Sequence, residues 1–173
     1  MKFVKAICLS VGVVSKWTAK IGMWAVVLLV LTVSFEVLMR YVFNAPTTWT
    51  FDVSYMLLSV FVALGFAYVL CQKGHVRVDV LYNKFSPRAK LIIDIAFTLT
   101  MFLPLFFMLT IVFTRDAWYA FQVHERTNVT SWYPPTWPYK SAVALGIAVF
   151  FLQGIGTFLH DTMSLVKGGK EPW

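Results

Sequence analysis

The spacing of the charged residues is the strongest constraint on this chain. Three stretches of 20 residues, 53–72, 95–114 and 141–160, contain no Asp, Glu, Lys or Arg. Twenty helical residues extend about 30 Å, which is the thickness of the hydrocarbon layer of a bilayer. A further apolar stretch, 21–43, carries charge only toward its end. The sequence therefore predicts an all-α integral membrane protein, one domain over residues 1–173, with four transmembrane helices at about 21–43, 51–72, 90–114 and 139–161.

The composition argues against a soluble enzyme. Hydrophobic residues make up 59% of the chain and charged residues 13%, whereas about a quarter of the residues of an average soluble domain are charged. The sequence also shows no Ser/His/Asp set, no glycine-rich phosphate loop and no metal-ligand spacing among its two cysteines and three histidines. We therefore expect no enzymatic activity, no metal and no cofactor.

The lysines and arginines predict the orientation. Eleven of the 15 lie before the first span, between the second and third spans, or after the fourth. Because cytoplasmic loops carry the excess of basic residues, both termini are predicted to be cytoplasmic, with the basic charge facing membrane lipid rather than nucleic acid. Apolar positions within 3–14 recur at helical spacing beside lysines, which indicates a short interfacial helix before the first span.

The connections between spans indicate an antiparallel bundle. The break at 44–49 is short and contains Pro46, so the first two spans must form a hairpin. Pro104 lies inside the third span and predicts a kink there. The outer segment, 115–138, is rich in tryptophan and tyrosine, as is typical of residues at a membrane interface.

Polar side chains near the first hairpin are the best candidates for a site, because they are costly to place in a membrane. Glu36 and Arg40 stand four residues apart on one helix, in the favourable order for an ion pair. Asp52, just beyond the hairpin, can approach Arg40. We expect a structural ion-pair cluster that fixes the outer hairpin. A direct role in moving an ion is the alternative, but Thr32 is the sole polar residue below Glu36 on that face.

Other polar and small residues are candidates for contacts within or between subunits. Residues 74–80 alternate polar and apolar side chains, which predicts an extended segment at the inner membrane surface. Gln153, deep in the fourth span, is expected to hydrogen-bond a neighbouring helix. A ridge of small residues, Ser59, Ala63, Ala67 and Cys71, suits close helix packing, either inside this chain or against another subunit.

Several of these residues resemble one known family, the small Q-type membrane subunit of tripartite ATP-independent periplasmic (TRAP) transporters. The similarity covers the whole chain and rests on Arg40, Phe43, Asn44, Pro46, Trp49, Asp52, Gly65, Gly74, His75, Val78, Asp79, Pro135, Trp137 and Pro138. Two features depart from the family pattern. Asp52 stands where glutamate is expected more often, and the stretch 125–138 is longer and more aromatic than usual.

The resemblance implies a heteromeric uptake system of the bacterial inner membrane. A periplasmic solute-binding protein captures a small organic anion, a large multi-span permease subunit carries it with a sodium gradient, and the small subunit braces the large one. Eight residues then become candidates for subunit interfaces: Trp49, Gly74, His75, Arg77, Asp79, Pro135, Trp137 and Gln153.

Two other functions stay open at this point. A haem or quinone anchor of an oxidoreductase would use His75 and His160, which are predicted on the same side. Both lie at or beyond the ends of spans, not at a shared buried depth. A self-assembling exporter or channel would need Glu36 as its buried acid, although its helix faces carry little charge.

Overall fold

The computed structural model describes residues 2–72 and 87–166, and these residues are helical apart from the connecting loops. The elements are α1 (Lys2–Tyr41), α2 (Trp49–Cys71), α4 (Pro87–Phe97), the π-helical segment η1 (Thr98–Phe102), α5 (Leu103–Gln122) and α6 (Trp137–Val166). Four segments are long and apolar enough to cross a membrane: Gly12–Tyr41, Trp49–Leu70, Arg88–Gln122 and Trp137–Leu165. The prediction of an all-α protein with four spans is thus confirmed.

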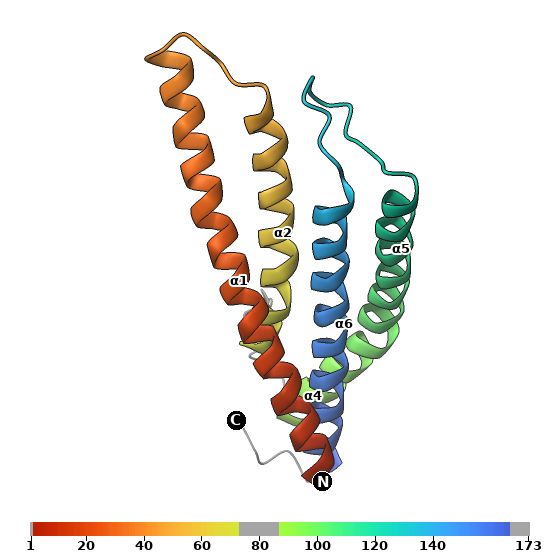
Figure 1. Ribbon diagram of the computed structural model, residues 1–173. Coiled ribbons are helices and arrows are strands. Elements are labelled where there is room, and N and C mark those ends of the chain that lie inside the picture. Colours follow the sequence, from red (N-terminus) through yellow and green to blue (C-terminus); the bar gives the residue numbers. More distant parts are fainter. Residues whose placement is uncertain (1, 73–86, 167–173) are drawn as a thin grey trace.

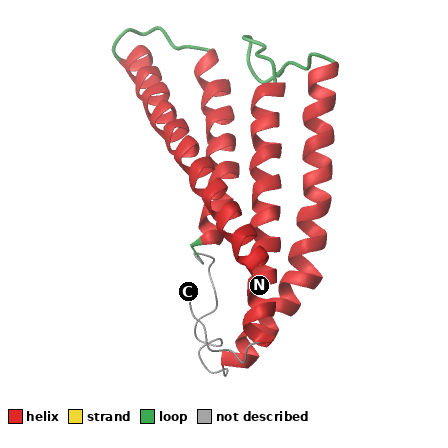
Figure 2. Ribbon diagram, turned by 60° about the horizontal axis from the view of Figure 1, so that its bottom comes forward, coloured by secondary structure: helices red, strands yellow, loops and turns green. Residues whose placement is uncertain are grey.

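The spans lie side by side in the order α1, α2, α6, α5, and consecutive spans run in opposite directions (Figure 1). Loops 42–48 and 123–136 lie together at one end of the molecule, which we call the hairpin end (Figures 1 and 2). Helix α1 is inclined to the others and also contacts α6 near its own N-terminal half. Because α2 packs between α1 and α6, it joins the two hairpins along most of their length.

Helix α1 has 40 residues and is longer than expected. The residues predicted to form a short interfacial helix continue without a break into the first span. The physical reason is local, since residues 15–20 contain neither proline nor glycine nor a turn sequence that would stop the helix.

The third span is irregular next to Pro104, where the sequence predicts a kink. The π-helical turn Thr98–Phe102 directly precedes α5, and α4 and α5 are inclined to each other at this point (Figure 1). Proline lacks an N–H and its ring crowds the carbonyl four residues earlier, so the regular hydrogen-bond ladder cannot continue through it. The span also continues to Gln122, so the first eight residues of the expected outer segment, 115–122, are helical.

Small residues let the helices approach closely. A Cβ atom added at Gly146 of α6 would lie 2.6 Å from the carbonyl group of Ala63 in α2, and both Ala63 and Ala67 are buried. This part of the small-residue ridge therefore packs inside the chain. The aromatic rings of Phe102, Phe106 and Phe150 cluster beside this contact and join the third span to α6.

Candidate functional site

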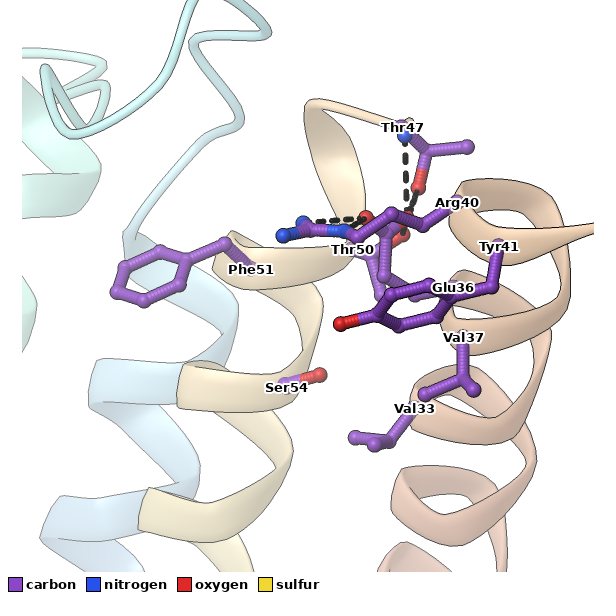
Figure 3. Close-up of a pocket in the computed structure, with 9 residues that line it drawn as sticks. All are labelled: Val33, Glu36, Val37, Arg40, Tyr41, Thr47, Thr50, Phe51 and Ser54. Carbon is purple, nitrogen blue, oxygen red and sulfur yellow. Dashed lines mark hydrogen bonds and ion pairs between the residues drawn. The ribbon is translucent and has the colours of Figure 1, made fainter. Parts of the chain in front are cut away.

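An ion pair on α1 lies at the hairpin end. Arg40 donates to Glu36 Oε1 from Nη2 at 2.6 Å and from Nε at 3.1 Å (Figure 3). The two residues are one helical turn apart, which places both side chains on the same face. Glu36 is 13% exposed and Arg40 is 56% exposed. The structure therefore brings together the pair that the sequence spacing indicates.

The other oxygen of Glu36 closes the first hairpin. Its Oε2 accepts hydrogen bonds from the backbone N–H of Thr47 at 3.0 Å, from the Thr47 hydroxyl, and from the Thr50 hydroxyl at 3.3 Å. Asn44, in the same loop, has a φ of 50°, a conformation that asparagine tolerates better than most residues. One carboxylate thus connects the end of α1 to the start of α2.

Asp52 does not join this cluster. Its side chain is 1% exposed and accepts a hydrogen bond from the hydroxyl of Thr130, in the loop 123–136. No hydrogen bond or ion pair connects Asp52 to Arg40 in the described part of the chain. Positions two residues apart on a helix differ by about 200° in direction. Thr50 therefore faces α1, whereas Asp52 faces the second hairpin.

Trp49 makes a second contact between the two hairpins. Its ring lies 5.9 Å from the ring of Phe35 in α1 and 6.5 Å from the ring of Trp132 in the loop 123–136. Such distances are typical of favourable aromatic pairs. A residue expected at a subunit interface is therefore used, at least in part, inside the chain. We refer to the contacts Asp52–Thr130 and Trp49–Trp132 as the hairpin latch.

A second charged cluster lies in the second hairpin. Lys140 Nζ of α6 is 2.7 Å from Glu125 Oε2 and 3.1 Å from Asp116 Oδ2 of α5. The loop between them is held by backbone hydrogen bonds, among them Thr136 N–H to the Glu125 carbonyl at 3.0 Å. Local sequence patterns do not predict this cluster, because Lys140 is 15 and 24 residues from its two partners and the three share no periodic pattern.

Gln153 forms the hydrogen bond to a neighbouring helix that its depth in the span indicates. The hydroxyl of Ser15 in α1 donates to Gln153 Oε1 at 3.1 Å, and both residues are buried. This contact fixes the point where α1 crosses α6. The side-chain amide of Gln153 therefore forms its hydrogen bond within this chain.

The remaining interface candidates divide into two groups. Pro135 and Trp137 lie on the exposed surface of the hairpin end, where Trp137 is 39% exposed and packs against Phe121. Gly74, His75, Arg77 and Asp79 lie outside the residues that the structure describes.

The arrangement is suited to holding helices in place. Each acid described at the hairpin end, Glu36, Asp52, Asp116 and Glu125, already accepts hydrogen bonds from the chain. No group of three or more His, Cys, Asp or Glu side chains that could hold a metal ion occurs within residues 2–72 and 87–166. These polar residues therefore form contacts that connect α1, α2, α5 and α6 at the hairpin end.

Comparison with known proteins gives one family match. The family model described as the DctQ component of tripartite ATP-independent periplasmic transporters matches residues 29–163, which is more than half of the chain. No curated protein matches the sequence. The matched region includes the loops of both hairpins and every contact described above except the one that Ser15 makes.

Proposed function

This chain belongs to the DctQ family, whose members are transporter components and not enzymes, and we propose that it is the small scaffold subunit that braces the large permease of a sodium-coupled uptake system. In this family the small subunit works with a large permease subunit and a binding protein. The bracing role, the sodium coupling and a small organic anion as solute are parts of the proposal. So is a position in the bacterial inner membrane with both termini in the cytoplasm.

The use of the charged side chains supports a bracing role. A subunit that carries a solute or an ion through the membrane needs polar groups that can exchange partners during transport. Here Glu36, Asp52 and Lys140 are engaged with neighbours in their own chain. The hairpin latch connects both hairpins at one end, and Ser15 with Gln153 connects α1 to α6 toward the other. A frame fastened at both ends resists deformation.

The surface of α1 supports the same role. Large apolar side chains cover this helix along its length and stay exposed, among them Trp17, Trp24, Leu31 and Leu38. Such a surface is suited to lipid or to an apolar partner helix, and it enlarges the area by which a complex is anchored in the bilayer. We propose that Pro135 and Trp137 at the hairpin end, together with Gly74, His75, Arg77 and Asp79, add contacts to the partner subunits.

A cross-link across the hairpin latch tests the bracing role directly. Cysteines at positions 52 and 130 replace a pair of side chains already in hydrogen-bond contact, and a disulfide there would lock the two hairpins together. If the chain is a fixed frame, oxidised transporter should retain solute uptake close to that of the reduced form. Each single-cysteine variant serves as a control for the loss of the Asp52–Thr130 hydrogen bond.

Two outcomes would contradict the proposal. If oxidation of the double-cysteine variant stops uptake and reduction restores it, the two hairpins move relative to each other during transport. If the tagged chain purifies from its native membrane without a large multi-span permease, it braces no such partner. Uptake measured with and without a sodium gradient, over a panel of organic acids, tests the coupling ion and the solute class separately.

A further inference from the structure

A cleft between α1 and α2 lies at the hairpin end, and the contacts of Glu36 with Arg40, Thr47 and Thr50 form part of its lining. Its volume is about 360 Å³, and the residues that line it include Val33, Val37, Arg40, Tyr41 and Ser54 (Figure 3). Both helices that form it span the membrane, and the cleft lies in the last turns of α1 and the first turns of α2. It is therefore open to the bilayer at the level of the lipid headgroups.

The cleft is apolar at one end and polar at the other. Val33 and Val37, 45% and 48% exposed, form the wall that lies deeper in the membrane. Nearer the loop, where Thr47 and Thr50 also line the cleft, the hydroxyl of Tyr41 is turned toward α2 and Arg40 extends from α1 toward α2 (Figure 3). Ser54 points into the gap at the level of the two valines (Figure 3). A ligand that fills this space must have an apolar part and a polar part.

Arg40 has donors left for such a ligand. A guanidinium group carries five N–H donors, and the bonds to Glu36 use one at Nε and one at Nη2. More than half of the Arg40 side chain is exposed, whereas Glu36 is turned inward to Thr47 and Thr50. Both members of the ion pair line the cleft, but the guanidinium of Arg40 is the more exposed of the two and has N–H groups left to donate. A phosphodiester is the membrane group that complements this charge.

We propose that the cleft binds one phospholipid molecule, with its phosphate on the guanidinium of Arg40 and an acyl chain along Val33 and Val37. The hydroxyls of Tyr41 and Ser54 add hydrogen bonds to the headgroup or the ester oxygens. A free phosphate ion would use the polar end alone and leave the valine wall unfilled. The proposal requires a membrane-spanning chain and is independent of the bracing role.

Lipid binding can be measured on the full chain, delipidated in mild detergent, by native mass spectrometry with added lipid. The probes are phosphatidylglycerol, phosphatidylethanolamine, diacylglycerol and inorganic phosphate. Both phospholipids should bind with one-to-one stoichiometry and more tightly than diacylglycerol, because diacylglycerol lacks the phosphate. Inorganic phosphate at the same concentration should not displace them.

Two pairs of matched variants locate the site. Arg40→Gln should weaken phospholipid binding about fivefold, the value expected for one cation near a membrane surface. Arg115→Gln, which removes an exposed arginine outside the cleft, should not. Val37→Trp fills the cleft and should abolish one-to-one binding. Val27→Trp makes the same change on the same helix at a residue of equal exposure, 47% against 48%, and should leave binding intact.

The valine pair keeps the test decisive if Arg40→Gln disturbs the hairpin. Equal binding by Val37→Trp and Val27→Trp would overturn the proposal, as would equal affinity for diacylglycerol and the phospholipids. Displacement by inorganic phosphate would show a simple anion site instead of a lipid site. A cysteine at position 37 that cross-links to the large permease subunit in native membranes would show that a protein segment fills the cleft, which would also overturn it.

Discussion

The carboxylate of Asp52, three residues into α2, accepts a hydrogen bond from the hydroxyl of Thr130, which lies 78 residues further along the chain in the loop 123–136. Asp52 is almost fully buried. A buried carboxylate needs hydrogen-bond partners, because its desolvation is otherwise uncompensated. This pair therefore ties the start of one hairpin to the loop of the other, and the geometry of the hairpin end depends on it.

Removal of the Thr130 hydroxyl should destabilise the chain measurably. Thr130→Val keeps the size of the side chain but leaves the Asp52 carboxylate without this donor, at an expected cost of about 1–3 kcal/mol. Thermal unfolding of the full chain in detergent, followed by tryptophan fluorescence, measures the change. Trp49 and Trp132 lie at the same contact, so their emission should shift first.

Thr110→Val is the matched control for that variant. The Thr110 hydroxyl donates to the carbonyl of Phe106 within its own helix, so its removal leaves no buried charge without a partner. Its unfolding temperature should stay close to that of the wild type. Equal destabilisation by the two variants would show that the Asp52–Thr130 contact contributes nothing particular to stability.

Because Glu36 closes the first hairpin, two substitutions at this position should lower the stability of the chain to different extents. Glu36→Gln removes the charge but keeps an acceptor for the N–H of Thr47, whereas Glu36→Leu removes both. We expect the free energy of unfolding of the leucine variant to be about 1–3 kcal/mol lower than that of the glutamine variant, since leucine leaves the N–H of Thr47 without an acceptor near the membrane. Chemical unfolding in mixed detergent, or protease access to the loop 42–48, measures this order. A leucine variant as stable as the glutamine variant would contradict it.

Local patterns in the sequence predict the spans and the Glu36–Arg40 pair. Insertion into a bilayer requires about 20 apolar residues in a row, so the gaps between charges locate α2, the third span and α6 directly. An ion pair at positions i and i+4 follows from helix geometry alone. Both inferences need only a short window of sequence, and the structure agrees with both.

The contacts that join separate elements could not be predicted in this way. Asp52 was expected beside Arg40 because the two are close in sequence, yet its position in the first turn of α2 faces Thr130. Lys140 and its two acids are brought together by the path of the loop 123–136. The π-helical turn at Thr98–Phe102 precedes Pro104 and lies against α6, where the ring of Phe102 meets Gly154. Each depends on tertiary arrangement that a local pattern does not contain.

The unfolding temperatures of three glycine-to-alanine variants should depend on the space around each glycine. At Gly154 a Cβ would meet the ring of Phe102 at 2.0 Å, at Gly146 it would meet the Ala63 backbone at 2.6 Å, and at Gly65 nothing lies within 4 Å. Overpacking of a tight contact costs about 1–3 kcal/mol. Gly146→Ala and Gly154→Ala should therefore lower the unfolding temperature, and Gly65→Ala should not.

A second substitution separates the two sensitive glycines. Phe102→Leu removes the ring that meets Gly154, so it should relieve much of the defect of Gly154→Ala. The Gly146 contact involves the backbone of Ala63, which no side-chain change there can remove, so Ala63→Gly should give Gly146→Ala only partial relief. Full rescue in the second case would contradict the close backbone approach of α2 and α6.

The hydrogen bond between Ser15 and Gln153 should show a positive coupling energy. Single variants Ser15→Ala and Gln153→Leu and their combination form a double-mutant cycle that isolates the pair. Side-chain hydrogen bonds between membrane helices average about 0.6 kcal/mol and reach about 1.7 kcal/mol, and both partners here are buried. Additive effects in the cycle would show that the crossing of α1 and α6 is held by packing alone.

Orientation in the membrane can be tested with the exposed loops. Both loops of the hairpin end lie on the same side of the molecule (Figure 1), and the distribution of lysine and arginine predicts that this side is periplasmic. In a background with Cys8 and Cys71 replaced by serine, a cysteine at Thr48 or at Val129, both exposed, should react with an impermeant maleimide added outside spheroplasts. The native Cys8, retained alone, should react only after lysis. Labelling of Cys8 in intact spheroplasts, with Thr48→Cys protected, would reverse the predicted orientation and place the hairpin latch and the proposed lipid cleft in the cytoplasmic leaflet.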